Sequence, residues 1–363
     1  MSASPALVIT TRLPPQVCGI GAYSWLAHKH RPDKSARDEF LVMEGAAESR
    51  AELGYDAITD FSGDPKALAQ ALRRAGTVSV LLHYAGRAYQ RFGCPTWLPG
   101  VLRKWKSEFP SGRLTVFFHE VPGEMPRLSR HFLLGKINLR IIRQLATVSD
   151  ALATNTEHHA QVLRKMSGGK QVHCFPVGSN IEPVATSASE ARVETEFVIF
   201  GLPFGRQQTF QSFQTEIREW RESGLLTKLH FIGPEDERLA AETNPVLNSL
   251  SDVVVRHGML PESEVSRFLC RARFALTNVS AATWSKSGAF MACAAHGCAV
   301  VIREAAVEVP LCYAVAATEI GRISAAEIAS RTTSLQKWYK DSADWSVTAR
   351  HLADLFQPQT NSP

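Results

Sequence analysis

The sequence predicts an α/β fold built from two doubly wound domains. Short apolar runs rich in β-branched residues alternate with amphipathic segments of helical length along the whole chain. Such alternation is typical of parallel sheets that are covered by helices on both faces. The chain has 363 residues, which is more than one hydrophobic core usually supports. Two domains of about 150–200 residues each are therefore expected.

The first half contains six strand candidates and five helix candidates. The strands are predicted at 6–11, 40–43, 78–83, 114–118, 151–154 and 172–175. The helices are predicted at 22–30, 65–74, 97–108, 130–145 and 157–165. The second of these helices has a clear start, because Asp64 can cap it and Pro65 suits the first helical position.

A change of composition separates the two halves. Residues 176–190 contain Gly178, Pro183 and a run of Thr, Ser and Ala, which indicates an interdomain linker. Strands then restart at 197–201, 229–232, 253–256, 274–277 and 299–303. Helices are predicted at 210–222, 235–247, 262–270, 287–296, 325–339 and 345–356. We expect a first domain over 1–183, a second over 190–342 and a C-terminal helical segment over 343–363.

Composition narrows the class of protein. The sequence is 45% hydrophobic and 21% charged, as in ordinary globular proteins, and no apolar stretch of about 18 residues occurs. The N-terminus lacks the pattern of a signal peptide. The net charge of +5 is spread along the chain, which favours phosphorylated ligands or an anionic membrane face only weakly. The seven cysteines form no CxxC pair, so we expect free, mostly buried thiols, a cytoplasmic location and no zinc site.

Two motifs of the first half follow predicted strands. Residues 14–23 read PPQVCGIGAY, with Gly19 and Gly21 at the start of a helix. Glycines allow a backbone to approach a ligand closely, and free helix N–H groups favour a phosphate; a plain strand-to-helix turn is the alternative. His119 and Glu120 directly follow the predicted strand at 114–118. A histidine there could hydrogen-bond a ligand hydroxyl while a carboxylate orients its ring, or it could be a capped strand-end residue.

Two motifs of the second half surround predicted helix starts. Residues 258–269 read GMLPESEVSRFL, a glycine-led loop followed by a helix with acidic residues in its first turn. Residues 285–301 read SKSGAFMACAAHGCAVV. Here Lys286, Ser287 and Gly288 open a helix, and the free amides of Ser287 and Gly288 are expected to bind a diphosphate. A small-residue helix that merely packs on a sheet is the alternative.

In order and spacing, these motifs resemble those of the retaining glycosyltransferases of family 4, which have the GT-B fold. The segments 146–155 and 175–181 also resemble that family, but they indicate fold rather than chemistry. The resemblance implies two Rossmann-like domains that face a central cleft, with the last helix packed on the first domain. It also implies a metal-independent hexosyltransferase that uses a nucleotide-diphosphate sugar and no other cofactor. His119 and Glu120 are then the catalytic candidates, and Gly19, Gly21, Arg206, Lys286, Ser287 and Gly288 are the donor-binding candidates.

The sequence departs from this family in two places. Many members carry two glutamates eight residues apart, and these positions fall on Trp284 and Ala292. Relatives also place an Arg and a Lys after the first strand of the second domain, whereas the loop after Gly201 has only Arg206. Because a leaving diphosphate needs fixed positive charge, Lys286 is our candidate for the missing lysine.

Two other functions stay open. The departures suit an inactive relative that binds a glycan or serves as a partner subunit, which would have no need of a nucleotide. A dinucleotide-dependent oxidoreductase is disfavoured, since no GxGxxG follows a strand with an acidic residue about 20 positions later. The acceptor is expected to be a glycan, a lipid-linked sugar or a small molecule, as in polysaccharide biosynthesis, and to contact the loops at 85–95 and 121–129. No nucleic-acid partner is expected, and peripheral association with the inner face of a membrane is left open.

Overall fold

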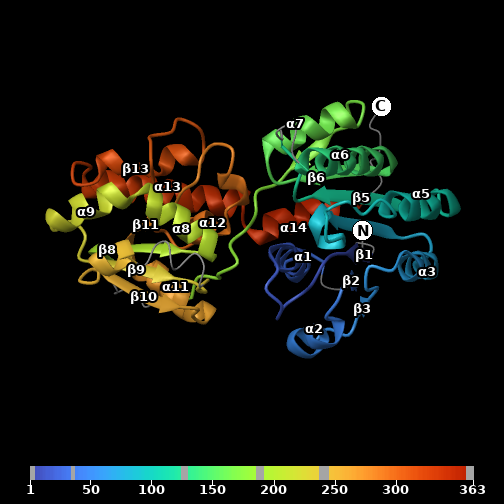
Figure 1. Ribbon diagram of the computed structural model, residues 1–363, viewed down its shortest axis with the longest axis horizontal. Helices are drawn as coiled ribbons and strands as arrows, with labels where there is room; N and C mark the ends of the chain where they lie inside the picture. The colour runs from blue at the N-terminus through green and yellow to red at the C-terminus, as the bar shows by residue number, and fades with distance from the viewer. Residues whose placement is uncertain (1–4, 34–36, 124–129, 185–191, 237–244, 357–363) are drawn as a thin grey trace. The chain divides into compact units, whose positions relative to one another are not determined.

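The structure, a computed structural model, describes residues 5–33, 37–123, 130–184, 192–236 and 245–356. It divides into two compact units (Figure 1). The first unit comprises residues up to Pro176 together with Trp345–Pro363, and the second comprises Val177–Asp344. The segment 177–183, which we had assigned to the first domain, therefore lies in the second unit. Each unit is described by itself below.

The first unit contains a seven-stranded parallel sheet in the order β3-β2-β1-β4-β5-β6-β7. Its strands are β1 (Ala6–Ile9), β2 (Glu39–Val42), β3 (Ile58–Asp60), β4 (Ser79–Tyr84), β5 (Arg113–Phe118), β6 (Ala151–Thr154) and β7 (Val172–Cys174). Strand β1 pairs with both β2 and β4. The strand order therefore reverses direction beside β1, which is where ligands bind in folds of this kind.

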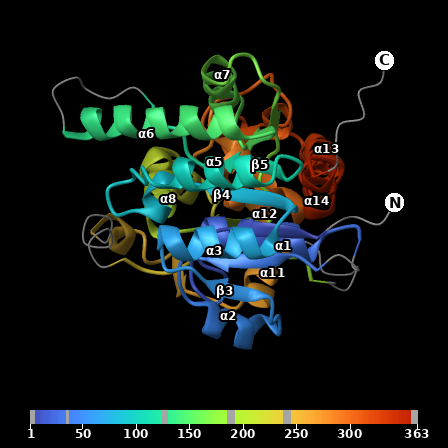
Figure 2. The same cartoon turned by 90° about the vertical axis from the view of Figure 1, so that its right-hand side faces the viewer.

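Helices cover both faces of this sheet. They are α1 (Gly19–Lys29), α2 (Ala46–Leu53), α3 (Pro65–Ala75), α4 (Gly86–Tyr89), α5 (Leu98–Glu108), α6 (Arg130–Val148), α7 (Glu157–Met166) and α14 (Trp345–Asp354). Helices α3, α5 and α6 lie next to one another in Figure 2. Helix α14 packs against α1, with the rings of Trp345 and Tyr23 5.0 Å apart. The C-terminal helix thus completes the first unit.

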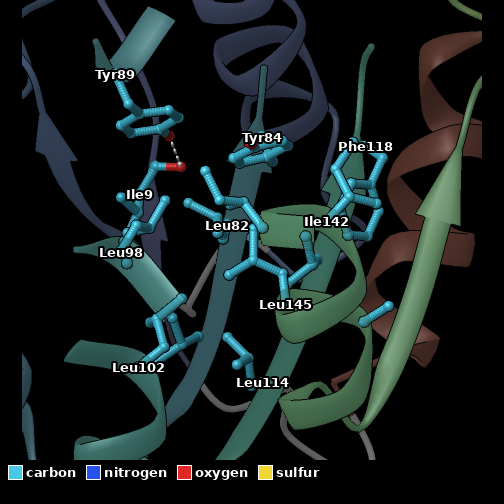
Figure 3. Close-up of a cluster of buried hydrophobic side chains, with 14 of the residues drawn as sticks. Ile9, Leu82, Tyr84, Tyr89, Leu98, Leu102, Leu114, Phe118, Ile142 and Leu145 are labelled. Atoms are coloured by element: carbon cyan, nitrogen blue, oxygen red, sulfur yellow. Dashed lines mark hydrogen bonds between the residues drawn. The ribbon is translucent and has the colours of Figure 1, made fainter. Parts of the chain in front are cut away.

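The main core of the first unit lies between the sheet and helices α3, α5 and α6 (Figure 3). Alternate residues of the strands point into it because successive side chains of a strand face opposite sides. The strands and helices contribute fully buried side chains, among them Leu82, Tyr84, Leu114, Phe118, Leu98, Leu102, Ile142 and Leu145. This core fixes the strand ends that carry His119 and Glu120.

The second unit repeats the topology with six parallel strands in the order β10-β9-β8-β11-β12-β13. Its strands are β8 (Val193–Phe200), β9 (Lys228–Ile232), β10 (Val254–Gly258), β11 (Ala272–Leu276), β12 (Ala299–Ile302) and β13 (Val315–Ala316). Its helices include α8 (Pro203–Ser212), α9 (Gln214–Glu222), α11 (Glu262–Arg271), α12 (Gly288–Ala295) and α13 (Ala325–Ser342), with the short 3-10 helix η1 (Trp284–Lys286). Two apolar clusters, one on each face, hold the sheet between these helices.

The predicted fold class is confirmed, because both units are parallel, doubly wound α/β sheets. Several details were wrong or missed. The predicted helix 210–222 is two helices that divide at Phe213, and the expected loop before it already belongs to α8. The short elements α2, β3, α4 and β13 were not predicted. Most of the predicted helix 235–247 lies outside the described residues, as does most of the loop 121–129.

The burial of the cysteines differs from the expectation. All seven cysteines are free thiols, but only Cys94, Cys293 and Cys298 are buried, so the expectation of mostly buried thiols was wrong. Among the helices of the described ranges, none has the length and apolarity that crossing a membrane requires.

Candidate functional site

The candidate site of the second unit lies at the carboxyl ends of β8 and β9. Strand β8 pairs with both β9 and β11, so the strand order reverses beside it. Gly201 follows β8 and Gly233 follows β9, and both have positive φ angles, of 141° and 138°. L-residues with side chains rarely adopt such angles. The chain therefore uses glycine at both strand ends that border the site.

Close contacts explain why glycine is needed at Gly233. A Cβ atom on this residue would lie 2.1 Å from the carbonyl oxygen of Gly201 and 3.1 Å from Nε of Arg206. A Cβ atom on Gly201 would lie 3.7 Å from the Cβ of Ala289, in the first turn of α12. The two strand ends, the side chain of Arg206 and the start of α12 are thus brought together. Gly233 is a site residue that our sequence analysis missed.

Arg206 is a buried cation, with 3% of its surface exposed. It lies on α8, and its Nη2 donates to the carbonyl oxygen of Pro234. Its guanidinium also lies over the ring of Phe231, 4.7 Å from the centroid. Its Nε and Nη1 atoms have no hydrogen-bond partner among the described residues. Burial lowers the pKa of this guanidinium, yet an arginine stays charged in proteins. The guanidinium therefore keeps hydrogen-bonding capacity that a ligand acceptor would satisfy.

The start of α12 carries the other donor-site candidates. Ser287 caps the helix, since its Oγ accepts from the backbone N–H of Phe290 at 3.1 Å. The amide of Ser287 donates to the carbonyl oxygen of Trp284 at 3.0 Å, so our expectation of a free Ser287 amide was wrong. The first helical amides, beginning at Gly288, have no acceptor within the helix itself. A Cβ atom on Gly288 would lie 4.0 Å from Nδ2 of Asn180. The side chain of Lys286 is exposed.

The two positions that lack glutamates are structural. Ala292 is fully buried in α12. Trp284 packs against the ring of Trp338 with centroids 5.4 Å apart. His296, at the end of α12, is also buried, and its Nε2 lies 2.8 Å from Oγ of Ser266. Burial lowers the pKa of His296. Neither the replaced positions nor His296 offers an accessible acid or base.

In the first unit, the two candidate glycines have different surroundings. A Cβ atom on Gly21 would lie 1.4 Å from the carbonyl oxygen of Arg12. Helix α1 therefore packs directly on the backbone after β1, which accounts for Gly21 without a ligand. Gly19 is the first residue of α1, and a Cβ atom there would meet nothing within 4 Å. Only Gly19 leaves its backbone open to a ligand.

His119 lies in a buried aromatic cluster, with 7% of its surface exposed. Its Nε2 is 2.9 Å from Nδ1 of His83, and its ring is 4.7 Å from that of Phe117 and 5.1 Å from that of Tyr23. This burial leaves little of the side chain accessible to the ligand hydroxyl that we had expected it to contact. Burial lowers the pKa of the His83 ring to about 3. Glu120, the next residue, is exposed.

Comparisons with known proteins add information on the fold. The chain is similar to the trehalose-6-phosphate synthase OtsA, with a TM-score of 0.63 and 13% identity over 98% of this chain and 99% of that one. It is also similar to WaaG, a glycosyltransferase involved in lipopolysaccharide biosynthesis, with a TM-score of 0.61 and 11% identity over 98% and 100%. The chain has the GT-B fold. No family model and no curated protein matches the sequence.

The GT-B fold alone does not decide the reaction. A UDP-GlcNAc 2-epimerase from Neisseria meningitidis, bound to UDP-GlcNAc, matches with a TM-score of 0.50 and 10% identity over 95% of this chain and 94% of that one. Structures with this fold therefore include both glycosyltransferases and an epimerase. Function has to be argued from the residues of the site.

Proposed function

We propose that the protein is a glycosyltransferase that takes a sugar from a nucleotide-diphosphate donor, and that the diphosphate binds in the second unit. The site is formed by the turn after β8, the turn after β9 and the start of α12. The buried guanidinium of Arg206 carries the proposal. Its Nε and Nη1 atoms, which have no hydrogen-bond partner in the part of the chain that the structure describes, cost folding free energy unless an acceptor binds them.

The charges of the site agree with a diphosphate ligand. A nucleoside diphosphate leaving group develops about two negative charges, whereas a helix N-terminus supplies about half a positive charge. Arg206 and Lys286 supply the remainder in this proposal. Glycine at 233 keeps a side chain out of the space beside Nε of Arg206. The proposed site therefore needs no metal ion, since fixed cations and backbone amides neutralise the phosphates.

In the proposed reaction, an acceptor hydroxyl oxygen forms a bond to the anomeric carbon of the sugar. The bond between that carbon and the diphosphate oxygen breaks, and the hydroxyl proton passes to the diphosphate or to water. Glu120 is our candidate for a carboxylate that contacts the acceptor hydroxyl, because it is exposed directly after β5 of the first unit. His119 is proposed as a positioning residue, which holds that strand end through its contact with His83.

A second candidate function is a binding protein that has lost catalysis. The burial of Ala292 and the packing of Trp284 favour it, since the site has no carboxylate at either position. A thermal-shift screen tests the leading proposal against UDP, GDP, ADP, the matching monophosphates and the corresponding nucleotide sugars. We expect one diphosphate to stabilise the protein more than its monophosphate. No stabilisation by any nucleotide would favour the binding protein.

The nucleotide products of the reaction distinguish a transferase from an epimerase. With the nucleotide sugar that stabilises the protein most, a transferase releases the free nucleoside diphosphate only when an acceptor is present, apart from slow hydrolysis. An epimerase changes the sugar without any acceptor. Chromatography of the nucleotide products distinguishes the two outcomes directly.

A further inference from the structure

A chain of hydrogen-bonded ionisable side chains crosses three neighbouring strands of the second unit. Nη2 of Arg271, on α11, donates to Oε1 of Glu196 at 2.7 Å, and Oε2 of the same carboxylate lies 3.2 Å from Nε2 of His230. Nδ1 of His230 in turn lies 3.0 Å from Nε2 of His257. Glu196 is 3% exposed and His230 is 4% exposed, whereas His257 is half-buried. The chain therefore links β8, β9 and β10.

His257 occupies an irregular position near the end of β10, which is an edge strand of the sheet. The register of β10 against β9 shifts at this point, since Arg256 lies opposite Phe231 and Gly258 lies opposite the next residue, Ile232. Such bulges are frequent at sheet edges and redirect a side chain. The extra residue in β10 is His257 itself, the residue that joins the chain.

Helix α11 packs over both imidazole rings. The ring of Phe268 has its centroid 4.9 Å from that of His230 and 4.4 Å from that of His257. The other charged groups that act on the two histidines come from β8 and α11, and they are Glu196, Glu264 and Arg271. Burial lowers the pKa of both imidazoles, and the carboxylates oppose this shift. Because a free histidine has a pKa of about 6.5, both rings are neutral at pH 7.

The carboxylate fixes the positions of the protons along the chain. Ionised Glu196 only accepts hydrogen bonds, so Nε2 of His230 carries a proton. In neutral His230 the other nitrogen, Nδ1, is then an acceptor, and Nε2–H of His257 donates to it. One added proton leaves this bond intact, because one N–H still faces one bare nitrogen. A second added proton places two N–H groups face to face, so the bond between the histidines breaks.

The end of β10 is joined through the backbone to the proposed nucleotide site. Gly258 follows His257, and its carbonyl oxygen accepts from the amide of Gly233 at 2.9 Å. Gly233 lies against Arg206, because a Cβ atom on this glycine would approach Nε of Arg206 to 3.1 Å. A displacement of the end of β10 therefore reaches the turn after β9, which borders Arg206.

We infer that Glu196, His230 and His257 form an acid-sensitive latch that holds the turn after β10 in place. The latch is closed at neutral pH and opens increasingly as the pH falls. The sign follows from the proton count, since the open state binds two protons readily whereas the closed state accommodates only one. Because Gly233 is bonded to this turn, opening weakens the binding of a nucleoside diphosphate. That last consequence rests on the proposed function, whereas the latch itself does not.

Amide hydrogen exchange of the full chain, followed by mass spectrometry, tests the latch without any ligand. Protection of the segments 229–233 and 254–258 should fall at least about tenfold between pH 7 and pH 5, after correction for the intrinsic exchange rates. Strand β11 of the same sheet is the internal reference and should lose less protection. This comparison is made within the wild-type protein and needs no variant.

Two substitutions of histidine by glutamine show whether the latch causes the loss of protection. His257→Gln should remove the excess loss in β10, because its amide can donate to neutral His230 and accept from charged His230. His173→Gln is the matched control. His173 is also half-buried, with a pKa that burial lowers, but it lies in the first unit. This variant should therefore exchange like the wild type.

Calorimetric titration of the preferred nucleoside diphosphate tests the consequence for the site. Between pH 7 and pH 5 the affinity of the wild type should fall about tenfold more than that of His257→Gln. Titration of the ligand's own phosphates is the same in both measurements and cancels in the comparison. His257→Ala, which cannot bond to His230, should weaken binding at both pH values.

The outcomes separate the latch from the proposed function. Equal loss of protection in β10 and β11, or in the wild type and His257→Gln, overturns the latch. If the exchange results are as expected but the affinity changes equally in both proteins, the latch does not control the site and that part of the inference is overturned. If no nucleoside diphosphate binds at either pH while the exchange results are as expected, the proposed function fails and the latch stands.

Discussion

Gly233 and Arg206 are in contact at the carboxyl edge of the second sheet. A Cβ atom on Gly233 would approach Nε of Arg206 to 3.1 Å and the carbonyl oxygen of Gly201 to 2.1 Å. Neither neighbour can move freely, because one is backbone and the other is a buried side chain. The glycine is therefore part of the geometry that holds the proposed anion site.

Gly233→Ala is expected to lower the free energy of unfolding by about 2–4 kcal/mol, since it combines a steric clash with an unfavourable φ angle. Gly224→Ala is the matched control. Gly224 also has positive φ, but a Cβ atom there meets nothing within 4 Å, so the cost should be only about 1 kcal/mol. Urea denaturation measures both. Equal losses would show that the contact with Gly201 is unimportant.

Lys286→Ala is expected to weaken binding of the preferred nucleoside diphosphate about tenfold at low salt. Lys286 is exposed, so its contribution should shrink as salt rises. Calorimetric titration at low and at physiological ionic strength measures the effect. A loss that is independent of salt, or no loss at low salt, would remove Lys286 from the donor site.

His119 and Glu120, which follow β5 of the first unit, are expected to respond differently to substitution. His119→Ala should lower the free energy of unfolding by about 2–4 kcal/mol, because it leaves a cavity and removes the partner of His83. Glu120→Gln, at an exposed position, should leave stability unchanged and reduce transfer. Denaturation curves and a transfer assay are compared for both variants. Normal transfer by Glu120→Gln would rule out its proposed role.

His83 makes stability depend on pH in a defined window. Burial lowers its pKa to about 3 in the folded protein, whereas an unfolded histidine titrates near 6.5. Between these values the unfolded state binds the extra proton, so stability rises with pH, by up to about 1.4 kcal/mol per pH unit for this residue. The contribution of His83 to the free energy of unfolding is fully present above about pH 6.5 and is lost as the pH falls toward 3.

His83→Asn tests this dependence, because the amide can still bond to His119 but cannot titrate. Denaturation curves at pH 5 and pH 7 should show a smaller change for the variant than for the wild type. Other buried histidines, such as His230 and His296, also have lowered pKa values and remain in both proteins. An identical change in both proteins would mean that His83 is protonated in the folded state.

Hydrophobic periodicity was sufficient to predict the two doubly wound sheets, because their strands are continuous apolar runs. It failed for β3, whose three residues include two exposed ones, and for α8. The buried residues of α8 include the polar Arg206, Gln207 and Thr209. A helix that buries polar side chains has no apolar stripe to reveal it, so we expected a loop there.

The site could be predicted only in outline. Residues 285–301 indicated a helix start of the correct kind, but the bond from the Ser287 amide to Trp284 depends on the turn η1, which local sequence does not specify. The need for glycine at 233 arises from contacts with Gly201 and Arg206, which are 32 and 27 positions away in the sequence. The burial of His119 likewise comes from Tyr23 and His83 on other elements.

Arg206 is proposed to bind the diphosphate of a nucleotide, and replacing it by methionine removes that contact. Methionine fills similar space without unpaired donors, so Arg206→Met should keep or raise the melting temperature. Its affinity for the preferred nucleoside diphosphate should fall roughly ten- to a hundredfold. Arg218→Met, an exposed arginine of α9, should retain full affinity. Unchanged nucleotide affinity in Arg206→Met, measured by calorimetric titration, would show that Arg206 does not bind the diphosphate.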